Sequence, residues 1–225
     1  MSSAAHEADL DPAEAARQAR ARRRSAQLMT AAARLMERDG SHAVSMQALA
    51  EEAGVSVGLI YRYFGGKDDL LLAVIVNVLD AFAIRVPNAI AAAGHDPVDR
   101  LMAAFRSYCE VIDQHRNAAV LTYRESRSLS QDGRQRIKEL EVQASEPLRA
   151  LLADGIEAGV LAPVDVELVA YNLLLAAHGW ALKHWYFERT FGFEDYVTKQ
   201  TTLALNALIQ PRYRRRYRKL LEFST

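Results

Sequence analysis

The stretch Gly54–Leu71, GVSVGLIYRYFGGKDDLL, decides how this sequence is interpreted. It holds a glycine turn, a short apolar and aromatic run, two further glycines and a charged group ahead of a leucine run. Gly54 readily adopts the left-handed conformation that a tight turn between helices needs. Ser56 can cap a helix of about two turns, and Gly65–Gly66 ends it. The stretch therefore predicts a short helix between two sharp turns.

Two helices are expected upstream of this turn. Asp11–Glu14 combines a capping residue, a proline at the first helical position and an acid, which is a strong helix start. That helix carries five arginines between Arg17 and Arg24 and stops at Asp39–Gly40. Ser45 then caps a short helix that Gly54 ends. A helix, a glycine turn and a short second helix make a helix-turn-helix, whose second helix enters the DNA major groove.

The second helix of this motif has two distinct faces. Ile60 and Phe64 are four residues apart and share the face that must be buried. On the other side, Val57 can contact a thymine methyl, and Gly58 lets the backbone come close to DNA. Tyr61 can give its hydroxyl to a phosphate, and Arg62 can offer its guanidinium to guanine or phosphate. A cation follows at the next helix start. An ordinary helical hairpin with a solvated face fits the same geometry, so both interpretations stay open here. The candidate contacts are Val57, Gly58, Tyr61, Arg62 and Lys67.

The remainder of the chain has helical periodicity and no alternating pattern typical of strands. We therefore predict an all-α fold of about nine helices, with an N-terminal helix-turn-helix three-helix domain over residues 1–66. A larger helical bundle is expected over residues 67–225. Its expected helices are a leucine-rich one ending at Pro87, then 96–115, 117–129, 133–158 kinked or restarted at Pro147, 165–185, and 194 to about 211.

Composition favours a soluble cytoplasmic protein. The chain has 225 residues, 50% of them hydrophobic, and zero formal net charge. Its single cysteine, Cys109, allows no internal disulfide, which fits a reducing compartment. The N-terminus has no signal-peptide core, and the apolar stretch Leu168–Leu182 is shorter than the roughly 20 residues of a membrane span. No membrane partner is expected.

The sequence offers little for enzyme chemistry. It contains no glycine-rich phosphate loop and no nucleophile elbow. We therefore expect no enzyme, no cofactor and no metal, and a helical partner-binding module without a DNA role stays as the alternative. Retention on heparin with steep salt dependence would favour DNA. Metal spacing is lacking among His42, His95, His115, His178 and His184.

Ser45–Leu71, SMQALAEEAGVSVGLIYRYFGGKDDLL, resembles the DNA-binding segment of the TetR family of transcriptional regulators. Departures are mild: Ile60, Tyr63 and Gly66 stand where the family usually has leucine, histidine and serine or asparagine. The family positions are filled by Ser45, Leu49, Ala50, Ala53, Gly54, Val55, Ser56, Tyr61, Tyr63, Phe64 and Lys67.

This resemblance implies a homodimeric regulator, released from a double-stranded DNA operator by a small-molecule effector. It assigns base or groove contacts to Gln47, Val57, Gly58 and Arg62. It assigns phosphate contacts to Ser45, Ser56, Tyr61, Tyr63 and Lys67. The arginine cluster of the first helix either reaches the adjacent groove or backbone, or is a solvated helix face.

The bundle carries a set of polar and aromatic residues, although most aromatics at helical spacing belong to a core. Its segments VLTYRESRSL, RQRIKELE and LLADGIEAGVL are more loosely similar to TetR regulators of fatty-acid, aromatic-acid and sterol-fragment catabolism, many of which respond to acyl-CoA thioesters. An acyl-CoA effector is expected if Arg124 and Arg127 flank an apolar tunnel. A neutral hydrophobe is expected if they pair with acids. The candidate ligand-binding residues are Tyr108, Tyr123, Arg124, Arg127, His178 and Trp185.

The two late apolar helices are expected to form the dimer, and the C-terminal PRYRRRYRKLLEFST is favoured as a solubilising tail over a nucleic-acid arm or an acidic-partner contact. The residues expected to pack on a symmetry mate are Leu173, Leu174, Leu203, Leu205 and Leu208.

Overall fold

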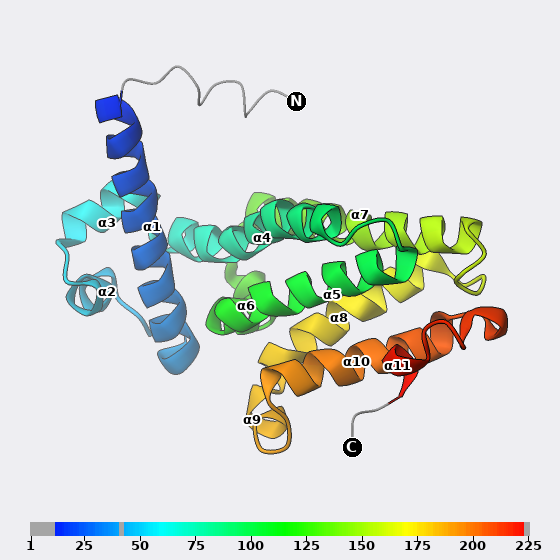
Figure 1. Cartoon of the computed structure of the whole chain (residues 1–225). Coiled ribbons are helices and arrows are strands. Elements are labelled where there is room, and N and C mark those ends of the chain that lie inside the picture. The colour runs from blue at the N-terminus through cyan, green and yellow to red at the C-terminus, as the bar shows by residue number, and fades with distance from the viewer. Residues whose placement is uncertain (1–11, 41–42, 223–225) are drawn as a thin grey trace. The chain divides into compact units, whose positions relative to one another are not determined.

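The computed structural model describes residues 12–40 and 43–222, and Figure 1 shows helices throughout this part of the chain. It has 11 α-helices, 9 of them with seven or more residues, so the predicted all-α fold is confirmed. Asp11 and His42 lie outside the described residues. Packing divides the chain into two compact units between Val74 and Ile75. This boundary falls inside a helix, α4.

The first unit is the three-helix domain with the beginning of α4. The Ser45 hydroxyl accepts a hydrogen bond from the Ala48 amide at 3.0 Å, and Ser56 accepts one from Leu59 at 3.3 Å, so both predicted caps are confirmed. Gly54 adopts a φ of +63°, the left-handed conformation that separates the two helices. The elements are α1 (Pro12–Asp39), α2 (Met46–Ala53), α3 (Val57–Phe64) and α4 (Lys67–Ala92).

The core of this unit is built from the C-terminal half of α1. Leu28 and Met36 are each 1% exposed, and they lie on the same helix as the buried Leu35. Leu49 of α2 and Ile60 of α3 are fully buried as well. Each short helix is therefore held by one large apolar anchor.

The second unit is a helical bundle organised around α5, which packs against α7, α8 and α10 (Figure 1). Half the residues of α5 are buried, and all of these except Ser107 are hydrophobic, including Phe105, Tyr108 and Ile112. The remaining elements are α5 (Pro97–Gln114), α6 (Arg116–Glu125), η2 (Ser126–Ser128), α7 (Gln131–Glu157), α8 (Val166–Leu182), α9 (His184–Phe187), α10 (Phe193–Leu208), η3 (Pro211–Tyr213) and α11 (Arg218–Leu221).

Contrary to prediction, α4 does not end at Pro87 and α7 does not restart at Pro147, while the alternative of a kink at Pro147 stays a prediction. α4 continues through Pro87 to Ala92, and α7 is one helix through Pro147. A proline inside a helix frees the carbonyl four residues earlier. Those carbonyls belong to Ala83 and Gln143, which are exposed residues and can bond to water instead.

α4 is long and apolar enough to cross a membrane by length and composition alone. The core helix of a globular protein passes the same test. Its large apolar side chains fit that role, since Leu70, Ile75 and Val86 are fully buried and Phe82 is 1% exposed.

The expected dimer-contact residues are corrected. Leu173, Leu174, Leu205 and Leu208 are at most 7% exposed within the single chain, so they belong to its own core. Leu203 is 61% exposed and is the one member of the predicted set that is available on the surface. Apolar periodicity identified the buried positions, but it did not show whether the chain's own core or a second copy of the chain covers them.

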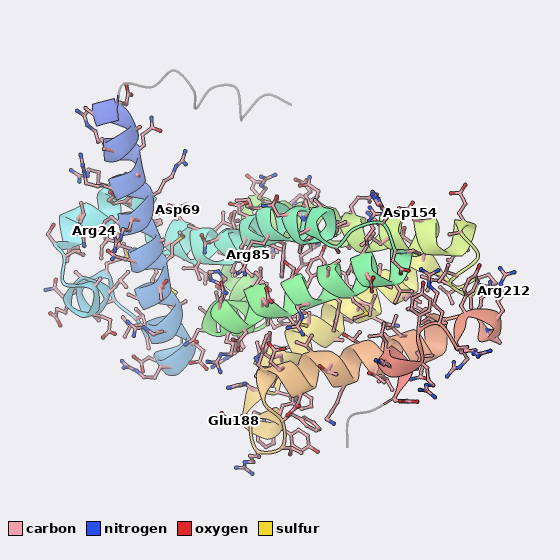
Figure 2. All side chains as sticks on the ribbon, in the orientation of Figure 1. Arg24, Asp69, Arg85, Asp154, Glu188 and Arg212 are labelled. Carbon is pink, nitrogen blue, oxygen red and sulfur yellow. The ribbon has the colours of Figure 1, made fainter. Side chains whose placement is uncertain are left out.

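The C-terminal segment is packed on the bundle rather than extending as a tail. The buried Tyr217 donates its hydroxyl hydrogen to the Asp96 carboxylate at 2.8 Å, and Arg216 forms an ion pair with the same group. Arg212, labelled in Figure 2, donates to the Gly159 carbonyl at 2.9 Å. Asp96 also caps α5, accepting from the Val98 amide at 2.9 Å.

Replacing Asp96 should therefore destabilise the bundle twice over. Asp96→Ala removes the cap of α5 and both contacts with the C-terminal segment, and we expect the free energy of unfolding to fall by about 2 kcal/mol. Tyr217→Phe keeps the cap and should cost about 1 kcal/mol. Urea denaturation followed by circular dichroism measures both changes. Equal losses in the two variants would show that neither the cap nor the Arg216 ion pair adds stability.

Candidate nucleic-acid interface and effector pocket

The α3 helix presents one exposed face with the predicted DNA contacts. Ile60 anchors the opposite face, so Tyr61 is 49% exposed and Arg62 and Gly58 are exposed too. No atom lies within 4 Å of a Cβ added to Gly58, so the backbone there is open to a ligand. Val57 is half-buried on the same short helix.

The other predicted contacts surround α3. Gln47 is exposed on α2, and Lys67 is the first residue of α4. Ser45 and Ser56 are exposed and already cap helices with their hydroxyl oxygens, which leaves each hydroxyl hydrogen for a phosphate. Tyr63 is half-buried. The domain thus brings these side chains to the surface, and their DNA roles remain predictions.

The bundle contains two adjoining cavities that share Thr122, Tyr123 and Glu141. The outer cavity, here called the mouth, has a volume of about 340 Å³. The inner cavity, here called the throat, has only about 20 Å³. The mouth is completed by Ser126, Arg127, Arg134, Ile137 and Lys138. The throat is completed by Ile75, Val78, Leu79, Phe82, Ile112, Ala119 and His178.

Charge is concentrated in the mouth. Arg127, Arg134 and Lys138 supply three cations against the single carboxylate of Glu141. Arg134 donates to the Leu129 carbonyl, which fixes it beside η2. Burial raises the pKa of Glu141, so its negative charge is disfavoured there. The mouth is a cationic site.

The throat is closed by an aromatic and histidine cluster. Tyr123 Oη lies 2.6 Å from His178 Nδ1, and the His178 ring stacks on Phe82 with ring centroids 6.2 Å apart. Burial lowers the pKa of His178 to about 4 and raises the pKa of Tyr123 to about 12. The tyrosine hydroxyl therefore donates to a neutral imidazole.

The structure brings together only part of the predicted ligand set. Tyr123, Arg127 and His178 line the cavities, and Tyr108 packs behind Phe82 with ring centroids 5.0 Å apart. Arg124 is exposed on α6 and lies outside the lining of both cavities. Trp185 is likewise absent from these linings. It is 58% exposed on α9, with Arg189 5.8 Å from its ring centroid.

Several lining residues were not anticipated from the sequence. Arg134 and Lys138 are four residues apart on α7, which places both on one helix face. Ile75, Leu79 and Phe82 form a similar stripe on α4. These spacings are visible in the sequence, but they also fit an ordinary solvated face and an ordinary core.

Comparison with known proteins places both units in one family. The model described as "Bacterial regulatory proteins, tetR family" matches residues 28–74, and "Tetracyclin repressor-like, C-terminal domain" matches residues 94–189. The chain is 38% identical over 185 residues to the HTH-type transcriptional regulator HbdR of Aromatoleum sp. (strain CIB), covering 82% of this chain and 79% of that protein. The chain belongs to the TetR family. These relatives are transcriptional regulators, so the predicted family and the prediction that the protein is not an enzyme are both confirmed.

Solved structures share the TetR fold. PfmR from Thermus thermophilus matches with a TM-score of 0.71 and 25% identity, over 81% of this chain and 99% of that one. AibR in complex with isovaleryl coenzyme A and operator DNA matches with a TM-score of 0.68 and 21% identity, over 80% and 97%. FadR from Bacillus subtilis in complex with stearoyl-CoA matches with a TM-score of 0.67 and 21% identity, over 80% and 97%.

Gly58→Ala should separate stability from DNA binding. The added methyl meets no atom within 4 Å and favours the helix, so the free energy of unfolding should rise by about 0.5–1 kcal/mol. The methyl stands on the face expected to approach DNA, so operator affinity should fall about tenfold. Thermal unfolding and fluorescence anisotropy measure the two effects. Unchanged affinity in a stabilised variant would remove Gly58 from the interface.

The pH dependence of stability should report the buried His178. Its pKa is lowered from 6.5 to about 4, so between these pH values the unfolded chain holds a proton that the folded chain lacks. The free energy of unfolding should therefore fall as pH drops from about 6.5 to 4, by roughly 3 kcal/mol from this residue. Urea denaturation from pH 7 to 4.5, with His178→Gln as reference, measures it. A constant difference between the two proteins across this range would contradict the assignment.

Proposed function

We propose that this TetR-family protein is a repressor that binds a palindromic operator as a homodimer and is released from it by an acyl-CoA thioester. The observation that carries the effector class is the cationic mouth adjoining an apolar throat. We place this activity in the cytoplasm, where the DNA is.

The mouth suits the polar end of an acyl-CoA. Arginine guanidinium groups bind phosphate oxygens through two parallel hydrogen bonds, and a lysine adds a point charge. Arg127, Arg134 and Lys138 surround a space of about 340 Å³, which admits part of a phosphorylated ligand. A free fatty acid brings one charge to this site, whereas the coenzyme A group brings several.

The throat suits the acyl end because its lining from α4 and α5 is apolar. Its volume of about 20 Å³ holds no more than about one water-sized group, so an acyl chain must displace side chains of Ile75, Leu79 or Phe82. All three belong to α4, which is one continuous helix from Lys67 at its start. Ligand binding and the geometry of α4 are thus linked.

This linkage supplies a route for release. An effector can shift DNA binding only by its differential affinity for two states of the protein. We propose that the acyl-bound state repositions α4, and with it the recognition helix α3 of each subunit. The complexes of AibR with isovaleryl coenzyme A and operator DNA, and of FadR with stearoyl-CoA, support the proposal by their shared fold.

Exposed apolar side chains on the late helices support the dimer. Leu168, Tyr171 and Leu175 of α8 recur at helical spacing and are 60%, 42% and 45% exposed, and Leu203 of α10 is 61% exposed. A second copy of the chain would cover them through a twofold axis. Twofold symmetry then requires half-sites about one helical turn apart or slightly more.

Titration of the protein–operator complex tests the proposal. The operator is a duplex selected from random sequences with the wild-type protein, and fluorescence anisotropy measures binding and stoichiometry. We expect two chains per palindrome and release by acyl-CoA thioesters but not by the matching free acids. Arg127→Gln combined with Lys138→Gln should require at least about tenfold more acyl-CoA, since two charged contacts are lost.

Arg136→Gln is the matched control, because Arg136 is exposed on the same helix and lies outside the lining of the mouth. It should behave as the wild type. Release by free acids alone, or by a neutral hydrophobe with no thioester response, would overturn the acyl-CoA assignment and leave the operator-binding role in place. Failure of the selection to yield any bound palindrome would overturn the repressor itself.

A further inference from the structure

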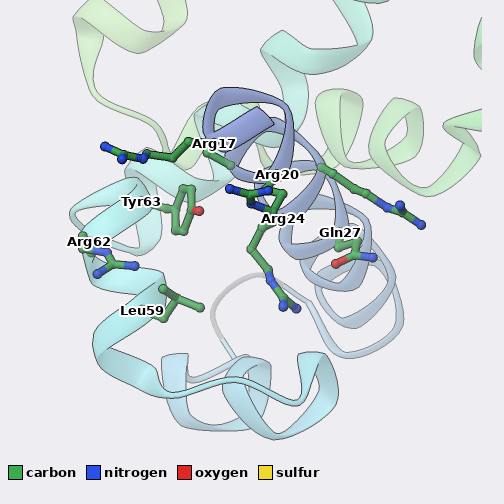
Figure 3. Close-up of a pocket in the computed structure, with 9 residues that line it drawn as sticks. Arg17, Arg20, Arg24, Gln27, Leu59, Arg62 and Tyr63 are labelled. Carbon is green, nitrogen blue, oxygen red and sulfur yellow. The ribbon is translucent and has the colours of Figure 1, made fainter. Parts of the chain in front are cut away.

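A basic hollow of about 560 Å³ lies between the N-terminal half of α1 and the recognition helix α3. Figure 3 shows Arg24 from α1 and Leu59 from α3 projecting into it. The two helices belong to the same compact unit. The full lining is Arg17, Arg20, Ala21, Arg23, Arg24, Gln27, Leu59, Arg62 and Tyr63.

The wall from α1 is one helix face. Arg17, Arg20, Arg24 and Gln27 are separated by three, four and three residues, so their side chains follow one another along the same side of the helix. The small Ala21 lies between them and keeps the hollow open. With a rise of about 1.5 Å per residue, the row from Arg17 to Arg24 spans roughly 10 Å.

This half of α1 has no core to hold it. No side chain from Ala13 to Gln27 is buried, and the packed stripe begins only at Leu28. An isolated helix of this length is marginal in water. The sequence also places no acid between Glu14 and Glu37, so the arginines repel one another along this stretch.

The positive charge of the hollow is not neutralised within residues 12–40 and 43–222. In that part of the chain, the ion pairs do not include Arg20, Arg24 or Arg62. A concentration of unpaired guanidinium groups in a chain of zero net charge favours a polyanionic partner.

We propose that the hollow holds the sugar-phosphate backbone of operator DNA just outside the half-site read by α3, with Arg17, Arg20 and Arg24 as phosphate contacts. The inference rests on the proposed operator-binding function and extends its footprint. Arg62 and Tyr63 connect the hollow directly to the recognition helix. Successive phosphates on one strand are about 3.4 Å apart along the axis, so a row of about 10 Å is long enough to reach more than one phosphate of that strand.

A strand of phosphates fits this hollow better than a small anion does. A small anion needs convergent donors, whereas these guanidinium groups are spaced along two turns of an exposed helix face. Such contacts carry no sequence information directly and add affinity and salt dependence. α1 would thus extend binding beyond the bases that α3 contacts.

Two duplexes and two charge-matched variants test the inference. One duplex ends at the outer edges of the selected palindrome, and the other adds about ten base pairs on each side. Arg20→Gln combined with Arg24→Gln should lose at least about tenfold in affinity for the long duplex. Its slope of log affinity against log salt should fall by about two per bound chain, since two phosphate contacts disappear. On the short duplex it should approach the wild type.

Arg136→Gln combined with Arg215→Gln is the control, because it removes two exposed arginines from the second unit and leaves the hollow intact. It should bind both duplexes like the wild type. Arg20→Lys combined with Arg24→Lys should keep most of the salt slope. Circular dichroism and the Tm confirm that each variant is folded.

Wild-type binding to the selected palindrome establishes the operator function independently of this result. If Arg20→Gln with Arg24→Gln then binds the long duplex with wild-type affinity and slope, the inference is wrong while the proposed function stands. Equal losses on the long and short duplexes would place the arginines within the half-site and overturn the flanking position. If the control variant loses as much affinity as Arg20→Gln with Arg24→Gln, the loss comes from the lower net charge of the protein and not from contacts in the hollow.

Discussion

Burial of one isoleucine sets the orientation of the recognition helix. α3 has only eight residues, and Ile60 is its one fully buried side chain. The left-handed turn at Gly54 delivers the chain to Ser56, whose cap starts the helix at a fixed residue. With the start and the rotation fixed, Tyr61 and Arg62 have no other direction than outward. A helix this short is specified by its caps and its anchor more than by its propensity.

The two units use α4 for different purposes. Its first turns complete the small domain through Leu70 and Leu71, and its later turns supply the throat through Ile75, Leu79 and Phe82. The helix is continuous across both stretches, and its one proline, Pro87, lies after them. The proposed release depends on this continuity, because one helix contributes side chains to both cores.

Helix caps and a glycine turn predicted the N-terminal fold from the sequence, whereas the candidate effector pocket depends on tertiary packing. Gly54, Ser45 and Ser56 act on their own neighbours, so the turn and both caps followed from the sequence. The pocket needs α4, α5, α6, α7 and α8 to meet, and no local rule brings Lys138 next to Tyr123. The same limit explains the error in the predicted dimer contacts: hydrophobic spacing identified Leu173 as buried but could not tell a core from an interface. At Pro147 the predicted restart was wrong, because α7 is one helix through that residue and the exposed Gln143 leaves the freed carbonyl accessible to water.

Under the proposed function, the closed throat affects the effector concentration at which the protein would leave its operator. When the binding-competent conformation is a minor fraction of the population, the apparent dissociation constant is the intrinsic one divided by that fraction. A cavity of about 20 Å³ at rest means that every ligand bears this conformational penalty before it gains any contact. If the effector is an acyl-CoA thioester as proposed, short or weakly bound acyl groups would fail to release the operator, while those that fill the opened space would release it. Under the proposed function, the packing of Phe82 against His178 would set the effector concentration needed for release, and single substitutions at these residues would change it.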